Sequence, residues 1–158
     1  MKIMKFNASD SEQVVSLFYE TVHTVNSKDY SKEQLDVWAP IKEKANKIDT
    51  WGISFMQNIT YIAKINEKIV GFSDLTFSGY LDRLYVHKDY QGQGIASALI
   101  DKLESKAKEL KILEIHTDAS ITAKPFFMSR GYTVVCEQTV HRQGIKLINY
   151  KMIKKLIL

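Results

Sequence analysis

The apolar positions of the chain change period several times, and each change predicts an element. Residues 3–7 favour an opening strand. Apolar residues from Val14 to Val22 recur at helical spacing after Ser9-Asp10-Ser11-Glu12, a segment typical of a capping box. Ser31 predicts the N-cap of a second, shorter helix that runs through Trp38.

Beyond residues 42–56, which could hold another helical turn or two, the period changes to two. The remaining predicted elements are a hairpin at 59–77, a strand at 80–87, a helix at about 93–110, a strand at 112–117, a short helix at about 121–130 capped by Ser120 and ended by Gly131, and a hairpin at 132–153. The order is β-α-α-β-β-β-α-β-α-β-β. It predicts an α/β (α+β) class with a mixed, mostly antiparallel sheet.

The segment Gln91-Gly92-Gln93-Gly94-Ile95-Ala96 joins a predicted strand to the longest predicted helix. The first N–H groups of a helix have no intrahelical partner, and the helix dipole favours anions there. Glycines let a ligand approach the backbone closely. The segment therefore predicts a phosphorylated cofactor, although a Gly-x-Gly pair also occurs in ordinary turns. Neither a P-loop nor a dinucleotide fingerprint is present.

Composition narrows the class of protein. The chain has 158 residues, 45% of them apolar and 25% charged, which is typical of one globular domain, here 1–158. No apolar run approaches the ~18 residues that span a bilayer, and no secretory signal is evident. Cys136 is the only cysteine and is expected to pack as a small apolar group. These features favour a cytoplasmic enzyme or binding domain with no membrane partner.

The net charge of +4 comes largely from lysines near a helix end and at the C-terminus. Such lysines usually complement the helix dipole, so a nucleic acid is not the expected partner. A polyanionic partner stays open as an alternative because the pI is about 9.0.

Two motifs together resemble the GNAT superfamily of acyl-CoA-dependent N-acyltransferases. Gln91, Gly94 and Ala96 match its Gln/Arg-x-x-Gly-x-Gly/Ala signature, and segment 118–132 is similar to its Asn-x-x-Ala-x-x-Phe-Tyr-x-x-x-Gly-Phe pattern. Segment 30–40 looks like a bacterial subgroup of uncertain substrate. The resemblance covers essentially the whole chain. It implies the GNAT fold, with about seven strands, about four helices and splayed central strands.

The resemblance also implies the cofactor acetyl-CoA and where it binds. Its pyrophosphate would lie on the amides of Gln91, Gly92, Gln93, Gly94, Ile95 and Ala96. Its pantetheine arm would pair with Leu84, Tyr85 and Val86 as an added strand. Ser120 and Phe127 would complete the cofactor site. Ser120 replaces the common Asn, and Phe127 replaces the Tyr whose hydroxyl usually protonates the leaving thiolate.

For the chemistry, the resemblance implies that the N–H of Val86 polarises the thioester carbonyl and that Asp82 is the base. Asp82 could instead pair with a basic neighbour, and Asp74 and His116 are alternative bases. His87 is expected at the surface. Tyr30 and Trp38 are expected to line the acceptor pocket, although core packing is equally consistent with Trp38. No metal-ligand cluster stands out in the sequence.

These residues predict an N-acetyltransferase that moves an acetyl group from acetyl-CoA directly to a primary amine of a small molecule, protein or peptide. A monomer or a homodimer is expected. Two alternatives stay open: acetylation of an amine on a polyanion such as aminoacyl-tRNA, and a non-catalytic acyl-CoA-binding sensor, which the lack of a hydroxyl at Phe127 would permit.

Overall fold

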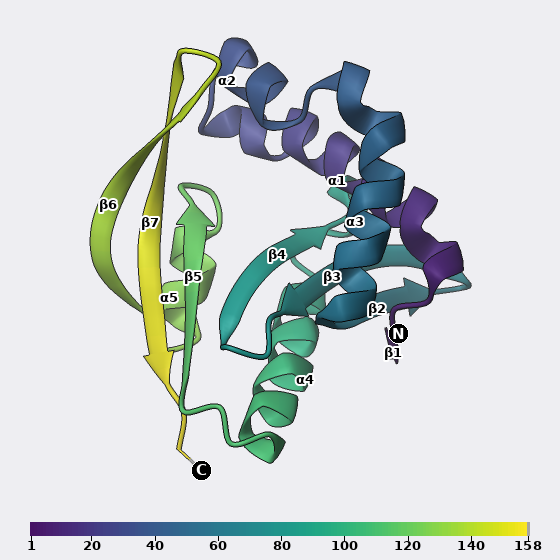
Figure 1. The fold of residues 1–158 in the computed structure, drawn as a ribbon, viewed down its shortest axis with the longest axis vertical. Helices are drawn as coiled ribbons and strands as arrows, with labels where there is room; N and C mark the ends of the chain where they lie inside the picture. Colours follow the sequence, from purple (N-terminus) through teal and green to yellow (C-terminus); the bar gives the residue numbers. More distant parts are fainter. Residues whose placement is uncertain (158) are drawn as a thin grey trace.

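Residues 1–157, which the computed structural model describes, form a seven-stranded mixed sheet flanked by five α-helices (Figure 1). Leu158, the last residue of the expected 1–158 domain, lies outside the described residues. In sheet order the strands are β1 (Lys2–Lys5), β2 (Ile59–Ile65), β3 (Lys68–Leu75), β4 (Tyr80–Val86), β5 (Glu114–Ser120), β7 (Ile145–Lys155) and β6 (Thr133–Arg142). The helices are α1 (Ser11–Thr24), α2 (Lys32–Trp38), α3 (Lys44–Gln57), α4 (Ile95–Glu109) and α5 (Lys124–Ser129).

The sheet carries a hydrophobic core on each face. One cluster joins α4 and α5 to the strands, and the other joins α1, α2 and α3 to them. Consecutive residues of β2 point into different clusters, Tyr61 toward α4 and Ile62 toward α1. Because β2 and β3 are covered on both faces, nearly all of their residues are buried.

The centre of the sheet is open because β4 and β5 diverge. They are parallel neighbours, and their register contains only Tyr80 with His116 and Leu81 with Thr117 in the described part of the chain. Beyond this point β4 continues to Val86 along β3, while β5 continues along β7. Figure 1 shows the two strands separating upward, with α2 and the β6–β7 hairpin above the gap. The splayed central strands implied by the resemblance are therefore present.

Helix α4 lies directly against β3 because a glycine faces it. A Cβ atom on Gly71 would stand 2.8 Å from Ile95 Cγ2 and 3.1 Å from Leu99 Cδ1. A side chain at this position would therefore have to push α4 outward. Since Ile95 is the first residue of α4, the missing side chain of Gly71 also sets where the N-terminus of that helix lies.

The predicted fold class is confirmed, and so are both hairpins. Each hairpin turns through two residues of positive φ. These are Asn66 and Glu67 in the β2–β3 hairpin, and Gln143 and Gly144 in the β6–β7 hairpin. The cap at Ser31 is also confirmed, because its hydroxyl accepts a hydrogen bond from the N–H of Gln34 at 3.2 Å.

Several local predictions were wrong. The N-terminal capping box joins Asn7 and Asp10 rather than Ser9 and Glu12, because a short 3₁₀ turn precedes α1. Residues 42–56 hold most of a full helix, α3, in place of a turn or two. The long helix starts at Ile95 instead of 93. Ser120 is the last residue of β5 and not the N-cap of α5. The N-cap of α5 is Ala123.

We expect Gly71→Val to destabilise the protein by about 1–3 kcal/mol, the usual cost of overpacking a core. Urea denaturation would measure this free energy of unfolding. Gly71→Ala should cost less because it adds one carbon instead of three. Equal stability of wild type and both variants would contradict the close packing of α4 on β3.

Candidate active site

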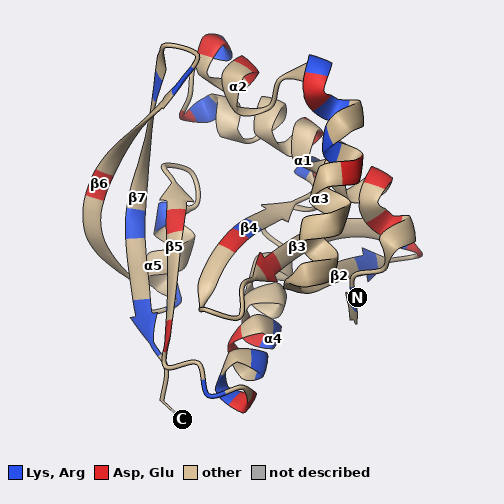
Figure 2. Cartoon of the chain, in the orientation of Figure 1, with Lys and Arg blue, Asp and Glu red and all other residues tan. Residues whose placement is uncertain are grey.

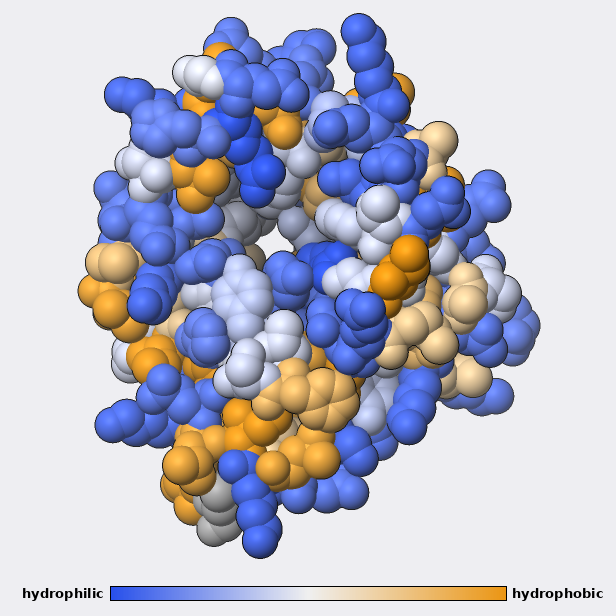
Figure 3. Space-filling model, viewed as in Figure 1, coloured by the Kyte–Doolittle hydropathy of each residue, from blue (hydrophilic) through white to orange (hydrophobic). Residues whose placement is uncertain are grey.

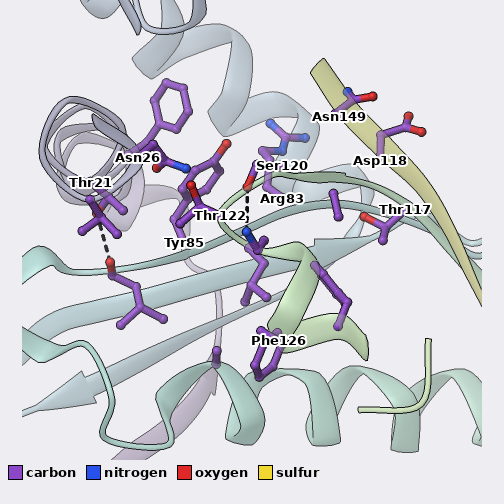
Figure 4. Close-up of a pocket in the computed structure, with 18 of the residues that line it drawn as sticks. Thr21, Asn26, Arg83, Tyr85, Thr117, Asp118, Ser120, Thr122, Phe126 and Asn149 are labelled. Carbon is purple, nitrogen blue, oxygen red and sulfur yellow. Dashed lines mark hydrogen bonds between the residues drawn. The ribbon is translucent and has the colours of Figure 1, made fainter. Parts of the chain in front are cut away.

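A cavity of about 970 Å³ occupies the gap between β4 and β5. Figure 3 shows the molecular surface hollowed near the centre of this view, and Figure 4 shows part of the lining. The lining contains the following residues predicted from the sequence: Tyr30, Trp38, Asp82, Leu84, Tyr85, Val86, Gln91, Gly92, Gly94, Ile95, Ala96, Ser120 and Phe127. Gln93 and the alternative bases Asp74 and His116 are not among the described residues that line it.

The start of α4 forms one end of the cavity. Gly94 is its N-cap, with φ of 79°, and no side chain caps the first N–H groups of the helix. Gly92 also has positive φ, 72°. A Cβ atom at either glycine would meet nothing within 4 Å, so the backbone faces open space. Uncapped amides with a positive helix end provide a site for an anionic group.

The Gln91 side chain holds this loop onto the end of β4. Its Nε2 donates to the carbonyl of Val86 at 2.7 Å. The hydroxyl of Thr21 on α1 donates to the same carbonyl at 3.0 Å (Figure 4). The sequence predicts a cofactor contact for the backbone amide of Gln91, and its side chain has this separate role. Thr21 was not among the residues predicted from the sequence. No sequence signal marks Thr21, because it lies in an ordinary amphipathic helix far from the motif.

The backbone of β4 presents an edge toward the gap. In an antiparallel ladder, residues alternate between those bonded to the partner strand and those pointing away from it. The N–H of His87 donates to the carbonyl of Val70 at 2.8 Å, so His87 and Tyr85 face β3. Leu84 and Val86 therefore direct their backbone groups toward β5, whose pairing with β4 has ended at Leu81.

The Arg83 guanidinium is buried under this edge, with 7% of the residue exposed. It lies 4.8 Å from the ring centre of Trp51 and 4.4 Å from that of Phe55. Its Nη2 donates to Ser54 Oγ at 2.7 Å. The aromatic rings stack on the cation and exclude water from it.

Two carboxylates share this guanidinium. Asp74 is fully buried and receives Nη2 at 2.9 Å and Nε at 3.2 Å. Burial raises the pKa of the Asp74 carboxyl, while Arg83 and an amide hydrogen bond from Asn58 act in the opposite direction. Asp82 receives Nη2 at 3.0 Å, but its side chain is 39% exposed and lines the cavity. Asp82 is therefore anchored by a basic neighbour and still accessible.

A further carboxylate, Asp118 on β5, was not identified from the sequence. It lines the cavity, and its Oδ2 accepts a hydrogen bond from the Tyr80 hydroxyl at 2.9 Å. Gln138 donates to its Oδ1 at 2.8 Å. Burial and this bond to Asp118 raise the pKa of the Tyr80 hydroxyl. Asp118 lies in the segment that carried the second motif, but two residues before its first matched position, Ser120, so it had no assigned role.

Tyr30 and Trp38 close the cavity from the helical side. The Tyr30 hydroxyl donates to the Ile148 carbonyl at 2.5 Å and accepts from the Ile121 N–H at 2.9 Å. The rings of Tyr30 and Trp38 meet edge to face, with centres 5.1 Å apart. Trp51 also lines the cavity, so both tryptophans of the chain border it.

The segment after β5 forms the other wall. The Ser120 hydroxyl accepts the N–H of Ala123 at 3.0 Å and so braces the turn into α5 (Figure 4). Phe127 borders the cavity but is only 2% exposed, because it packs against Tyr132 and Phe126. Phe126 is partly buried and also lines the cavity. It offers more ring surface to a ligand than Phe127 does.

Two minor expectations were wrong. His87 is buried at 7% exposure, because its ring packs edge to face on Tyr90 and its Nδ1 accepts the N–H of Asp89. Burial lowers the pKa of this imidazole, and the nearby Lys68 adds to the effect. Cys136 is exposed on β6, an edge strand, instead of packing in the core.

Comparison with known proteins decides the family. Residues 26–154 match the family described as an acetyltransferase (GNAT) domain. The chain belongs to the GNAT acetyltransferase family. This acetyltransferase is 33% identical over 152 residues to an uncharacterised N-acetyltransferase, YafP, of Escherichia coli (strain K12), across 96% of this chain and 94% of that protein.

Solved structures agree with the fold. A GCN5-related N-acetyltransferase from Rhodopseudomonas palustris superposes on the acetyltransferase with a TM-score of 0.91 at 32% identity, across 98% of this chain and 95% of that chain. YncA from Salmonella typhimurium, solved with its cofactor acetyl-CoA, shares the fold with a TM-score of 0.74 at 16% identity, across 100% and 95%. The expected GNAT membership and enzyme class are confirmed.

Two further findings concern the described part of this acetyltransferase. None of its helices there has the length and apolar character needed to cross a bilayer. The same residues contain no group of three or more His, Cys, Asp or Glu side chains arranged to hold a metal ion.

The two carboxylates that share Arg83 should differ sharply in their effect on stability. We expect Asp74→Ala to cost about 3–5 kcal/mol, since it leaves a buried guanidinium without its main counter-charge. Asp82→Ala should cost at most about 1 kcal/mol because Asp82 is partly solvated. Urea denaturation of both variants would measure this, and equal losses would contradict the assignment of Asp74 as the structural partner of Arg83.

Proposed function

We propose that residues 1–158 act as one N-acetyltransferase domain that transfers an acetyl group from acetyl-CoA directly to a primary amine of a small molecule, protein or peptide. One observation carries the proposal. A single cavity joins the uncapped N-terminus of α4, the free edge of β4 and the accessible carboxylate of Asp82. A diphosphate, a peptide-like arm and an amine would each have a complementary surface there.

The cavity fits acetyl-CoA in its chemistry. Gly92 and Gly94 leave open space beside the amides that begin α4, which suits a pyrophosphate. The backbone of Leu84 and Val86 can pair with the amides of the pantetheine arm, as in the addition of a strand to a sheet edge. The partly exposed Phe126 adds an apolar surface for that arm. YncA, which shares the fold, was solved with acetyl-CoA as its cofactor.

When bound, acetyl-CoA supplies an activated acyl carbon and a thiolate leaving group. The N–H of Val86 would donate to the thioester oxygen as negative charge develops on it. The Gln91 and Thr21 hydrogen bonds to the carbonyl of the same residue fix this peptide in place. The acceptor nitrogen attacks the acyl carbon, the carbon–sulfur bond breaks, and its electron pair leaves with the sulfur.

Asp82 would accept the proton that the amine loses. Val86 lies four positions after Asp82 on an extended strand, about 13 Å away, so the proton would pass through intervening water. Phe127 has no hydroxyl, and water or the acceptor's own ammonium proton would protonate the departing thiolate. Arg83 keeps the Asp82 carboxylate fixed beside the cavity.

The cofactor site can be tested with two matched glycine substitutions. We expect Gly94→Glu to weaken acetyl-CoA binding at least tenfold, or ~1.4 kcal/mol, because it places bulk and negative charge at the pyrophosphate. Calorimetric titration would measure the affinity.

Gly144→Glu is the control for that experiment. Gly144 has the same φ of 79° and the same open surroundings, but it lies in the β6–β7 turn. It should therefore bear the same backbone strain with little change in affinity. If Gly94→Glu bound acetyl-CoA as wild type does, the proposed cofactor site would be wrong.

The base can be tested with Asp82→Asn. We expect turnover to fall by roughly 10²-fold or more, with acetyl-CoA affinity nearly unchanged. Thiol release across a panel of amines, followed as a function of pH, would measure it. Asp118→Asn provides the comparison, since Asp118 also lines the cavity. A large loss in Asp118→Asn with full activity in Asp82→Asn would transfer the role to Asp118.

A further inference from the structure

We propose that the acceptor is an amine bearing a single carboxylate several bonds from its nitrogen, as in an ω-amino acid, and that Lys47, Arg83 and Arg142 bind this carboxylate. We call these three residues the cationic wall; each of them lines the cavity. The inference rests on the proposed transfer to an amine and adds the chemical class of the acceptor.

Arg83 has one donor group left over. Hydrogen bonds to Ser54, Asp74 and Asp82 occupy its Nε and Nη2. Its Nη1 has no hydrogen-bond partner among residues 1–157, and this atom is not fully buried. Because Arg83 lines the cavity, its unpartnered Nη1 is the donor that a ligand there could use. A buried guanidinium with a free edge is suited to binding an anion.

Lys47 on α3 supplies a second cation. Its Nζ lies 4.8 Å from the ring centre of Trp51, the same distance at which Arg83 Cζ lies from that ring. Lys47 forms no ion pair within the described part of the chain. Burial lowers the pKa of its ammonium, Arg142 and Arg83 add to this, and Glu43 acts in the opposite direction. An anion placed here would relieve the repulsion among these cations.

Arg142 completes the wall from the opposite half of the fold. It is the last residue of β6, at the turn of the β6–β7 hairpin. Neither its side chain nor that of Lys47 forms a hydrogen bond or an ion pair anywhere in residues 1–157. Two cations from α3 and β6 thus border one cavity without an ion-pair partner among residues 1–157, and a bound anion would provide one.

The other side of the cavity is acidic. Asp82 and Asp118 both line it, on β4 and β5. They suit the positive or proton-losing amine, as the cationic wall suits the carboxylate. Asp82 lies 3.0 Å from the Arg83 guanidinium, so the carboxylate subsite borders the proposed base. The reacting nitrogen must reach the acyl carbon near the Val86 N–H, about 13 Å along the strand from Asp82. The amine and the anion of the acceptor must therefore be separated by several bonds, as in an ω-amino acid.

A monoanion fits this wall better than a phosphate or a polyanion. Asp74 and Asp82 already neutralise Arg83 and would repel a doubly charged group. Figure 2 shows lysines and arginines spread over α3, α4, β7 and the β6–β7 hairpin, with no continuous basic stripe on this face. The cationic wall lies beside Trp51 inside a cavity. A cavity does not offer the extended basic surface that a nucleic-acid backbone would follow.

The test compares ω-amino acids of increasing chain length with their own amides as acceptors. Each pair shares the same amine position and chain length, and only the acid carries the carboxylate. We expect kcat/KM for thiol release from acetyl-CoA to be at least tenfold higher for the acid of the preferred pair. The amide has the less basic amine, which favours the amide when no anion subsite exists, so this preference is a stringent criterion.

Lys47→Met removes the charge and keeps most of the alkyl stem. It should reduce the acid-over-amide preference about tenfold, and Arg142→Gln should reduce it less, because Arg142 is exposed and more screened. Lys146→Gln, on the same hairpin but outside the lining, is the control and should leave the preference unchanged. Equal or better use of amides, or a preference unaffected by Lys47→Met, would overturn the inference.

A binding measurement separates this inference from the proposed function. If no amine reacts while acetyl-CoA still binds, direct transfer to an amine is wrong, and the acceptor class is judged by calorimetric titration of the CoA-saturated protein. Tighter binding of the acid than of its amide, lost in Lys47→Met, would support the cationic wall. Equal binding of acid and amide, or binding of neither, would overturn it.

Discussion

The short pairing of β4 with β5 is the constraint on which the rest of this structure depends. The two parallel strands share a register of two residue pairs in the described chain, closed by the Thr117 hydroxyl, which donates to the Leu81 carbonyl at 2.8 Å. Every residue of β4 after that point has lost a neighbour on one side. Unpaired backbone groups are costly when they are buried, so an open strand edge must find other partners.

Only some of the backbone groups on the open edge of β4 find hydrogen-bond partners within the protein. The Val86 carbonyl receives two side-chain donors, from Thr21 and Gln91, which come from α1 and from the loop before α4. The amides that face the gap have no partner on β5 in the described chain. The same divergence separates the two halves of the sheet far enough to admit a cavity, and Tyr30 then bridges the halves by bonding both Ile148 and Ile121.

A buried ion cluster supports the same strand from below. Arg83 joins Asp74 on β3, Asp82 on β4 and Ser54 on α3, so one cation ties three elements together. Such a cluster is weak as a source of stability, because desolvation offsets much of the attraction. The cluster instead fixes positions. The Arg83 guanidinium pairs with Asp74 inside the core and holds the Asp82 carboxylate at the cavity.

Sequence reasoning succeeded where the local chain determines the geometry. The turn at Gly92 and Gly94, the hairpin at Asn66 and the cap at Ser31 each depend on residues a few positions apart. It failed where partners come from distant elements. Thr21, Lys47 and Asp118 line the cavity only because helices and strands far apart in the chain converge, and no spacing rule marks them.

Local rules also failed where competing signals lay close together. The segment from Asn7 to Glu12 contains two possible capping boxes offset by two residues, and the structure uses the first. Cys136 looked apolar in sequence, but it lies on the edge strand β6, which has a neighbouring strand on one side only and is largely exposed. The family resemblance supplied the placement of the cofactor residues, which residue patterns alone would have reduced to a generic phosphate loop.

The placement of the aromatic residues has a practical consequence. The chain has two tryptophans, Trp38 and Trp51, and both border the cavity. Trp51 stands beside the cations Lys47 and Arg83, while Trp38 stands against Tyr30. Nearly all of the indole emission of this protein therefore originates at the site itself. Intrinsic fluorescence of the unmodified chain would report the arrival of either substrate without an attached dye, and the two indoles would sense it from different walls.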